Sequence, residues 1–462
     1  MEAWKVACTP EEAGVSSKGL LKYLDAVLAS GLEHHSILVL RNGMLACKMN
    51  FAPYDDQTPH VLFSLSKTFT SAAAGFAVQE GLLRWDSRVL EVLSDKAPEN
   101  PSVWLQSVTL HDLLTMGSGL APESDGLGRH EEDWARSILQ YDCDAQPGTR
   151  FHYNSHGTYL VSAMVQRVCG MTVRDYLWPR LFEPLGLPKP EWDTCPQGVC
   201  TGGWGLHLST ESIARFGQCM LHKGMWQGRQ ILPPEWLEKA TAQQIENASP
   251  TAPNPDSDWE QGYGYQIWRT RGDRYRGDGA YGQICMVSPR LNMVVAITAG
   301  LNDMHRETGL MHEYLFPAAE MEPGTAQEQQ LLKRRLAELA YPWPSHEDDA
   351  SELASRYVGE DVELRIEAMG VSLHFAEGDT QAHCEMGWFE PEAFEFVPGI
   401  PGAPAVRCLG MAGWKDGVLS MLVRMPEAPF TIIAQAKPKD GGLELQLGGI
   451  RIRERTVWLK KA

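Results

Sequence analysis

Ser64 and Lys67, in the segment Phe63-Ser64-Leu65-Ser66-Lys67, are the residues whose types and spacing most clearly indicate chemistry. On a helix, residues three apart share a face, so the Ser64 hydroxyl and the Lys67 amine can meet. A lysine in a partly desolvated pocket loses proton affinity and can accept the proton of a serine hydroxyl. The pair therefore predicts a serine nucleophile with its own base. The alternative is that Ser64 only caps the helix and Lys67 is solvated, although a lysine in the first turn opposes the helix dipole.

Tyr153 supplies the second chemically informative group. It stands in the segment FHYNSHG, residues 151–157, and Ser155 follows two positions later, just before a helical run. A serine nucleophile needs a group that delivers a proton to the leaving group, and a tyrosine hydroxyl beside a lysine can do this. We expect Tyr153 to relay that proton and later to help water attack the acyl-enzyme. The alternative is a buried tyrosine that only anchors the start of a helix.

The elements that position these residues begin with a predicted hairpin. Residues 36–49 read as two apolar strands joined by Asn42-Gly43, a dipeptide suited to a type I′ turn. The run that starts at Ser66 is rich in Ala and straight-chain residues, which predicts a helix that Gly81 can end. Helical periodicity then dominates from 104 to 182, and short β-like runs return from 263 to 301. The predicted sheet is therefore completed after the helices.

Three parts are predicted along the chain. They are a catalytic domain over residues 1–320, a helical linker over 321–350 that ends in the Pro- and acid-rich YPWPSHEDD, and a small all-β domain over 351–462. Pro, Asn, Asp and Ser crowd residues 246–261, which predicts a mobile loop that acts as a lid.

The order of these motifs resembles the serine β-lactamase and penicillin-binding-protein superfamily, and within it the class C-like esterase branch. The segments FSLSKTFTSA, FHYNSHGTYL, TGGWGLHLSTESIARFG and DGAYGQICMVSP occur in the expected order within residues 9 to 315. The resemblance implies an α+β fold, in which a helical subdomain packs on an antiparallel sheet flanked by helices. It also implies that Ser64, Lys67 and Tyr153 are catalytic, and that the backbone amides of Ser64 and Ala280 form the oxyanion hole.

The chain departs from the family pattern at two places. Ser155 stands where the second box normally ends in Asn, so its hydrogen-bonding reach is shorter. Gly277-Asp278-Gly279 stands where the third box is usually Lys-Thr-Gly or His-x-Gly. Recognition of a substrate carboxylate is then lost unless Arg276 moves in, and Asp278 would repel an anion if it faces the cleft.

Three residues of these two boxes and one further tryptophan complete the predicted site. The resemblance implies that Ser155, Asp278 and Gly279 bind substrate, and it makes Trp204 a candidate wall of the acyl pocket, although packing in the core is as good an explanation for a lone tryptophan. The segment from Gly277 to Gly282 also matches Gly-x-Gly-x-x-Gly, but a β-like run follows it where a dinucleotide site requires a helix.

Composition excludes several classes of partner. A net charge of −18 argues against nucleic acid and anionic membranes, which require basic patches. The start of the sequence has no hydrophobic signal core, and ten scattered cysteines are typical of free thiols in a reducing compartment, so we expect a cytoplasmic location. Cys195 and Cys200 have a poor spacing for zinc, and neither a metal nor another cofactor is predicted.

These residues together predict a serine hydrolase that cleaves small ester or amide substrates without a cofactor. A D-amino-acid peptidase or amidase, or a β-lactamase, is the nearest alternative. An alternative of another class is a catalytically degenerate member that binds its ligand without turnover, which the altered second and third boxes would explain. The sequence leaves the substrate and the oligomeric state open.

Overall fold

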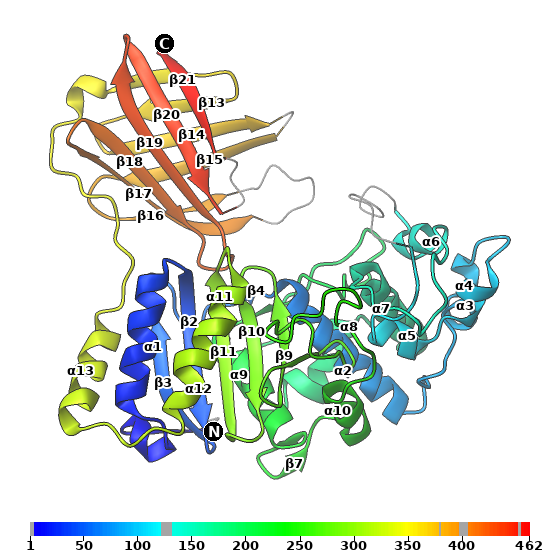
Figure 1. Cartoon of the computed structure of the whole chain (residues 1–462). Coiled ribbons are helices and arrows are strands. Elements are labelled where there is room, and N and C mark those ends of the chain that lie inside the picture. Colours follow the sequence, from blue (N-terminus) through cyan, green and yellow to red (C-terminus); the bar gives the residue numbers. More distant parts are fainter. Residues whose placement is uncertain (1–3, 122–131, 378–379, 397–404, 451–453) are drawn as a thin grey trace. The chain divides into compact units, whose positions relative to one another are not determined.

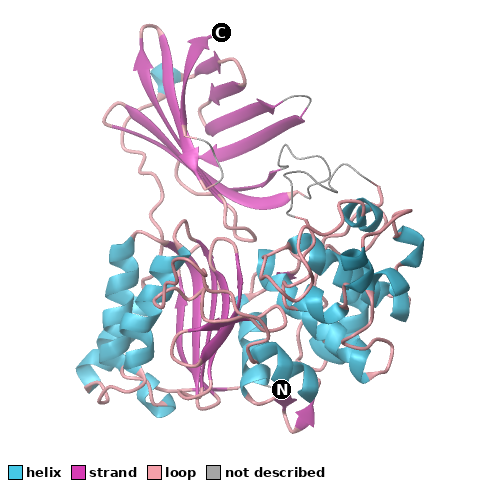
Figure 2. Cartoon of the chain, turned by 45° about the vertical axis from the view of Figure 1, so that its right-hand side comes forward, coloured by secondary structure: helices cyan, strands magenta, loops and turns pink. Residues whose placement is uncertain are grey.

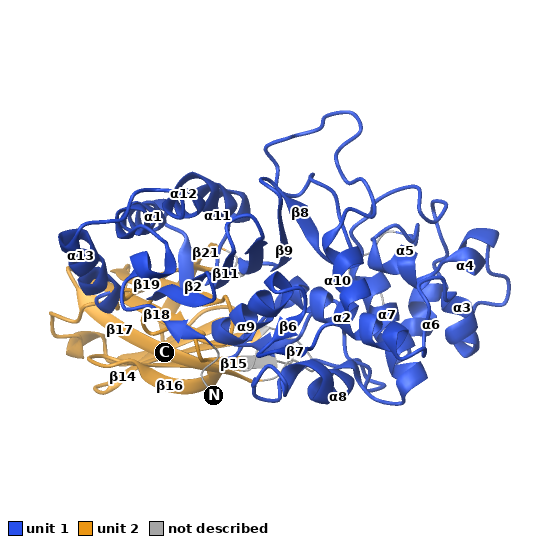
Figure 3. Cartoon of the chain, turned by 90° about the horizontal axis from the view of Figure 1, so that it is seen from below, with its two compact units in different colours: residues 1–50, 59–338 blue, residues 51–58, 339–462 orange. Residues whose placement is uncertain are grey.

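The computed structural model describes residues 4–121, 132–377, 380–396, 405–450 and 454–462 of the 462-residue chain. These residues form two compact units (Figure 3). Unit 1 comprises residues 1–50 and 59–338, and unit 2 comprises residues 51–58 and 339–462. The predicted α+β, β-lactamase-like fold with a small C-terminal all-β domain is confirmed.

A seven-stranded sheet forms the centre of unit 1 (Figure 1). Its spatial order is β1-β3-β2-β11-β10-β9-β8, and all neighbours are antiparallel except β1 and β3. The predicted hairpin is confirmed, because Asn42 (φ 53°) and Gly43 (φ 75°) both adopt the left-handed backbone that a type I′ turn requires. The strands are β1 (Lys5–Val6), β2 (Glu33–Arg41), β3 (Met44–Asn50), β8 (Trp268–Thr270), β9 (Arg274–Gly279), β10 (Gln283–Ser288) and β11 (Met293–Gly300).

Helices cover both faces of this sheet. α9 (Thr210–Leu221) packs on β2, β10 and β11, and Gly217 permits this contact because a Cβ there would lie 2.6 Å from Val294 Cγ1. The helices on the opposite side pack against one another, as Figure 3 shows. They are α1 (Ser17–Ser30), α11 (Met304–Leu310), the turn η5 (Met311–Leu315), α12 (Phe316–Ala318) and α13 (Ala326–Ala337).

A helical body completes unit 1 (Figure 2). Its centre is α2 (Ser66–Gln79), in which every residue from Ser66 to Ala77 is buried. Small side chains allow this close packing: a Cβ on Gly75 would lie 2.4 Å from the Trp236 ring. The other members are α3 (Val89–Val92), η3 (Ser94–Lys96), α4 (Val103–Ser107), α5 (Leu110–Leu114), α6 (Trp134–Leu139), α7 (Ser155–Cys169), α8 (Val173–Leu177), η4 (Trp178–Phe182) and α10 (Pro234–Thr241).

Short elements make up the rest of unit 1. The turn η1 (Pro10–Ala13) precedes α1, and the turn η2 (Phe63–Leu65) leads directly into α2. Two small antiparallel ladders pair β4 (His60–Val61) with β5 (His207–Leu208), and β6 (Met225–Trp226) with β7 (Arg229–Gln230). The first ladder fixes the chain three residues before Ser64. Among the described residues of both units, no helix is long and apolar enough to cross a membrane.

Unit 2 is a β-barrel that follows the turn η6 (Ser351–Leu353). Ten strands pair in the order β15-β14-β13-β12-β21-β20-β19-β18-β17-β16, and a bridge between Gly387 and Met411 joins β15 to β17. Alternating residues such as Leu364 and Ile366 are buried, as expected for strands with one face on a core. The strands are β12 (Ser355–Val358), β13 (Val362–Ile366), β14 (Gly370–Glu377), β15 (Thr380–Gly387), β16 (Glu392–Phe396), β17 (Val406–Lys415), β18 (Val418–Arg424), β19 (Thr431–Lys439), β20 (Gly442–Gly449) and β21 (Arg455–Lys461).

The two units differ in detail from the three predicted parts, whose bounds stay a prediction. α13 groups with unit 1, and residues 51–58, between β3 and β4, group with unit 2. This short segment is tied to residues 339–341, because Ala52 N–H donates to Leu339 O at 3.1 Å and Tyr341 N–H donates to Ala52 O at 2.8 Å. Unit 2 therefore includes a segment that lies far away in the sequence.

Candidate active site

Ser64 lies in the turn η2, immediately before α2, and its side chain is half-buried. The preceding residue, Phe63, has a left-handed backbone (φ 46°), which is uncommon for a bulky residue and marks a strained turn. The Phe63 ring packs edge-on against the Tyr281 ring with 5.3 Å between their centroids. Packing against this ring helps to hold the turn that presents Ser64.

Lys67 is buried, with 2% of its surface exposed, so the alternative of a solvated lysine is wrong. Its Nζ lies 3.0 Å from Ser64 Oγ, 3.1 Å from Ser155 Oγ and 2.9 Å from the carbonyl oxygen of Gly203. The carbonyl can only accept a hydrogen bond, whereas both hydroxyls can donate or accept. The structure thus brings together the predicted nucleophile, its predicted base and the predicted substrate-binding Ser155.

The second box lies at the start of α7. Asn154 is the N-cap of this helix, and its Oδ1 accepts a hydrogen bond from Gly157 N–H at 2.9 Å. The side-chain oxygen of Asn154 therefore caps α7, and the residue of this box that contacts Lys67 through its hydroxyl is Ser155. The Tyr153 ring stacks on the Trp268 ring (5.4 Å, 18°), and Lys67 Nζ lies 4.9 Å from the centre of the Tyr153 ring.

The third box is the end of β9, which runs beside the Ser64 turn. A Cβ on Gly279 would lie 2.0 Å from Leu62 O and 3.1 Å from Leu65 N, so only glycine allows the two backbones to approach this closely. Ala280 follows directly, which fits its predicted part in the oxyanion hole. That part stays a prediction.

Asp278 and Arg276 form a buried ion pair on β9. Arg276 is 0% exposed and Asp278 is 7% exposed. Arg276 Nε donates to Asp278 Oδ2 at 2.9 Å, and Arg276 Nη1 donates to the carbonyl oxygen of Asp258 at 2.8 Å. The arginine is therefore occupied by the protein itself, and the negative charge of Asp278 is paired.

The ring of Trp204 contacts Trp134 of the helical body, with 5.9 Å between ring centroids. Its predicted place in the wall of the acyl pocket stays a prediction. The neighbouring Gly203 contributes instead through its carbonyl oxygen, which contacts Lys67. Sequence reasoning missed this contact because a backbone oxygen has no side-chain signature.

Gln266 is a second residue that the sequence did not reveal. Its Oε1 accepts from Thr158 on α7 at 2.8 Å, and its carbonyl oxygen accepts from Thr68 on α2 at 3.0 Å. Its Nε2 donates to the carbonyl oxygens of Leu113 and Leu114 at 3.1 Å. One buried glutamine thus joins α5 and α7 through its side chain and α2 through its backbone carbonyl. Its left-handed backbone (φ 60°) favours Asn or Gly, so nothing in the sequence marks a glutamine there.

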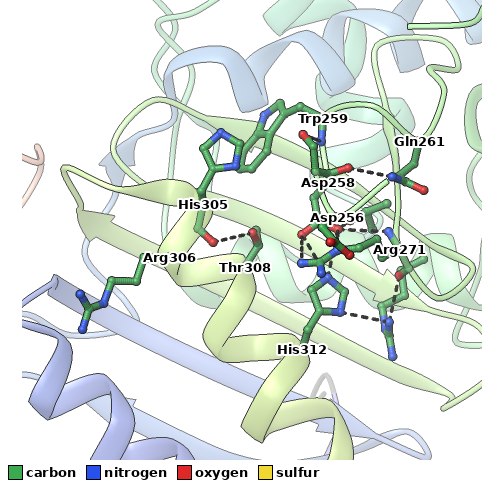
Figure 4. A network of polar contacts seen from close by, with 12 residues as sticks. Asp256, Asp258, Trp259, Gln261, Arg271, His305, Arg306, Thr308 and His312 are labelled. Atoms are coloured by element: carbon green, nitrogen blue, oxygen red, sulfur yellow. Dashed lines mark hydrogen bonds and ion pairs between the residues drawn. The ribbon is translucent and has the colours of Figure 1, made fainter. Parts of the chain in front are cut away.

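The segment 246–261, predicted to be a mobile lid, is anchored to unit 1 through Asp258 (Figure 4). His312 Nε2 lies 3.0 and 3.1 Å from the two Asp258 carboxylate oxygens, and Arg271 Nη2 donates at 3.1 Å. Thr270 also donates to this carboxylate. Burial alone would raise the pKa of Asp258, but these hydrogen bonds outweigh burial and hold the pKa well below its usual range.

Further hydrogen bonds close the segment on itself. Asn247 Nδ2 donates to Trp259 O at 2.9 Å, and its Oδ1 accepts from Gly262 N–H at 2.7 Å. Glu260 accepts from the backbone N–H of Asn254 at 2.9 Å. The segment is therefore held by hydrogen bonds in this structure, and its movement as a lid stays a prediction.

The comparison with protein families agrees with this geometry. Residues 27–320 match the Beta-lactamase family. The chain belongs to this family. The resemblance seen in the sequence is thus confirmed, and the assignment as an enzyme of the serine hydrolase type is supported.

Similar proteins include several hydrolases. The chain is 28% identical over 195 residues to penicillin-binding protein 4 of Amycolatopsis lactamdurans, a match that covers 35% of this chain and about half (50%) of that protein. It is 23% identical over 279 residues to 6-aminohexanoate-dimer hydrolase of Paenarthrobacter ureafaciens, with 56% of this chain and 71% of that protein covered. Among solved structures, EstCE1, a hydrolase with promiscuous acyltransferase activity, superposes with a TM-score of 0.53 at 17% identity and covers 66% of this chain and 99% of its own.

Proposed function

We propose that this chain is a serine hydrolase that cleaves small, uncharged ester or amide substrates through an acyl-enzyme on Ser64. The observation that carries the proposal is the 3.0 Å contact between Ser64 Oγ and Lys67 Nζ at a site where the lysine is 2% exposed. An amine that is shielded from water and contacts a serine hydroxyl is placed to act as the general base that accepts the serine proton.

In the proposed mechanism, Lys67 takes the proton of Ser64 as Ser64 Oγ attacks the substrate carbonyl. The Ser64 and Ala280 amides then bind the oxyanion of the tetrahedral intermediate. Tyr153 delivers a proton to the leaving alcohol oxygen or amine nitrogen and takes back the proton that Lys67 received from Ser64. The alcohol or amine then departs, and Ser64 is left acylated. Water, deprotonated through the same groups, then attacks the acyl-enzyme and restores Ser64. No cofactor takes part in this scheme.

Two features support uncharged substrates. The third box lacks the lysine or histidine that would bind a carboxylate, and Arg276, the nearest arginine in sequence, is engaged by Asp278 and the Asp258 carbonyl. The similar 6-aminohexanoate-dimer hydrolase supports amide as well as ester cleavage. We propose a small-molecule substrate, a cytoplasmic location and neither nucleic acid nor membrane as partner.

Labelling with a fluorophosphonate tests the proposal directly, because only an activated serine reacts with this probe. We expect one adduct, located by mass spectrometry on the peptide that carries Ser64, and no adduct in the Ser64→Ala variant. Ser66→Ala, two residues away, is the matched control and should label like the wild type. An unlabelled wild type would instead support a degenerate member that binds ligand without turnover.

Substrate preference is a second expected outcome. A charge-assisted hydrogen bond to a substrate carboxylate contributes about 1.5–3 kcal/mol, so its absence should weaken recognition of penicillins and D-Ala-D-Ala peptides by about ten- to a hundredfold. We expect measurable hydrolysis of p-nitrophenyl butyrate, poor hydrolysis of nitrocefin, and dependence of both on Ser64. A kcat/KM for nitrocefin equal to that for the ester would contradict this preference.

A further inference from the structure

Arg276 is a buried cation beside the rings of Trp259 and Trp268. Its guanidinium carbon lies 4.3 Å from the centre of the Trp259 ring and 5.9 Å from that of Trp268, so aromatic faces cover it. Its polar contacts are with Asp278 and the Asp258 carbonyl. An arginine that stacks on aromatic rings is well suited to bind a carboxylate, and here the carboxylate is that of Asp278.

This cation lies next to the candidate active site. Trp268, one of the two rings that cover Arg276, also stacks on Tyr153, whose ring lies 4.9 Å from Lys67 Nζ. Asp278 immediately precedes Gly279, whose backbone touches the Ser64 turn. Tyr153 and Trp259 also pack against the small hydrophobic cluster that contains Trp268. A carboxylate on Arg276 would thus be at the border of the site that contains Ser64.

The geometry of the ion pair leaves Arg276 Nη2 without a well-directed hydrogen bond. Nε and Nη2 of Arg276 both lie 2.9 Å from the same Asp278 oxygen, Oδ2. Nη2 is buried but makes no well-directed hydrogen bond, although it is close to this carboxylate. A carboxylate that faced the guanidinium edge with both oxygens would satisfy the two nitrogens separately. Asp278 lies on the same strand, two residues from Arg276, and it offers the guanidinium only one of its carboxylate oxygens. It therefore occupies the carboxylate position on Arg276 without the two-oxygen geometry.

We propose that Asp278 occupies the place that a substrate carboxylate would take on Arg276, and that this internal pair sets the preference for uncharged over anionic substrates. The inference rests on the proposed function, because it names the specificity of that same site. The pair determines specificity because Arg276 forms a subsite for an anion and Asp278 already fills that subsite.

The Asp258 loop keeps the pair closed. The Asp258 carbonyl accepts a hydrogen bond from Arg276. The Asp258 carboxylate is held by Arg271 and His312 (Figure 4). Trp259 lies over the guanidinium from the same loop and packs against His305 at 4.3 Å. Arg276 is therefore held by Asp278, the Asp258 carbonyl and the rings of Trp259 and Trp268, and removal of Asp278 is the change that opens it to an external anion.

The first test uses binding rather than catalysis. Asp278→Gly vacates the carboxylate position, and the double variant Arg276→Met/Asp278→Gly removes the cation as well. Because a ligand that binds only the folded state raises Tm, about 0.1 M sodium acetate should raise the Tm of Asp278→Gly by about 2–4 °C relative to sodium chloride of equal ionic strength. The wild type and the double variant should not respond.

The second test measures selectivity with two esters of matched length, p-nitrophenyl butyrate and mono-p-nitrophenyl succinate. We expect the ratio of kcat/KM for the anionic ester to that for the neutral ester to rise about ten- to a hundredfold in Asp278→Gly. The double variant should lose this gain, because the carboxylate then has no cation to bind.

The outcomes separate this inference from the proposed function. If the wild type hydrolyses the neutral ester through Ser64 but Asp278→Gly shows neither the acetate response nor the change in ratio, the inference fails and the function stands. A gain that persists in the double variant also overturns it. Asp278→Ser serves as a second variant with less backbone freedom. If both variants stay unfolded even in acetate, the proposal is wrong, because a filled subsite should restore the folded state.

Discussion

The partners of Lys67 determine which protons this residue can move. One hydrogen of Nζ is committed to the Gly203 carbonyl, which can only accept. Nζ also contacts the hydroxyls of Ser64 and Ser155, and each hydroxyl can either donate or accept a hydrogen bond. A neutral amine can therefore receive the Ser64 proton without losing its other partners. Ser155 contacts the lysine with a hydroxyl at the position where the family usually has an amide.

Removal of the Ser155 hydroxyl should slow catalysis moderately. In Ser155→Ala, Lys67 loses its contact with this hydroxyl, and since a hydrogen bond contributes about 0.5–1.5 kcal/mol, we expect kcat/KM for p-nitrophenyl butyrate to fall up to about tenfold. Ser162→Ala is the matched control, because it removes a buried hydroxyl from the same helix, one that donates to Cys200 O at 2.7 Å. Equal losses in both variants would argue that Ser155 acts only on the stability of α7.

Lys67 and Tyr153 should act as a unit. Lys67→Ala and Tyr153→Phe are each expected to lower kcat by about 10² or more, because each removes one end of the proposed proton path. Phenylalanine keeps the ring that stacks on Trp268, so the second variant isolates the hydroxyl. The double variant should lose far less than the sum of the two losses in free energy. Strict additivity, measured from initial rates, would show that the two residues serve different steps.

At the scale of elements, the sequence predicts local structure well and tertiary anchors poorly. The hairpin around Asn42-Gly43 and the helix after Ser64 follow from turn chemistry and helix propensity, and both are present. The loop 246–261 has the composition of a mobile segment, but its anchors come from Thr270, Arg271 and His312, which local composition does not encode. The same holds for the Gly203 carbonyl, which reaches Lys67 only through the fold.

The Asp258 anchor should make the stability of unit 1 sensitive to acid. Because the pKa of Asp258 is lowered in the folded state, its contribution is present above the unfolded pKa of about 3.9 and is lost as pH falls toward the folded value. Asp258→Asn should be less stable than the wild type at pH 7. Below about pH 4 the difference should shrink by about 1.4 kcal/mol per pH unit, measured by urea unfolding. Asp273→Asn, which breaks an exposed pair with Arg269, is the control and should change little.

At the scale of the whole molecule, the Pro- and acid-rich segment after α13 differs from a free linker. The backbone N–H groups of Glu347 and Asp348 donate to Trp414 O at 3.1 and 3.2 Å, and Trp414 N–H donates to His346 Nδ1 at 3.2 Å. Composition predicts an exposed linker, whereas hydrogen bonds to β17 hold the segment within unit 2. We expect limited proteolysis to spare residues 341–350 until unit 2 unfolds. Cleavage there in the native protein, seen by mass spectrometry, would contradict this.

The grouping of residues 51–58 with unit 2 has a larger consequence, because these residues are followed by β4 and then by Ser64. Phe51 and Tyr54 are buried, and both rings contact Tyr341, at 5.7 and 6.1 Å. A chain that ends at residue 338 would expose both rings and free the segment that leads to the nucleophile. We expect this truncation to lower the Tm of unit 1 and to slow fluorophosphonate labelling of Ser64. A second truncation has residues 51–58 replaced by a Gly/Ser linker of equal length. This variant lacks the exposed rings, but the segment before Ser64 is still unanchored. It should therefore regain solubility without regaining the labelling rate. If the simple truncation labels as fast as the full chain, unit 2 is dispensable for the geometry of the Ser64 turn.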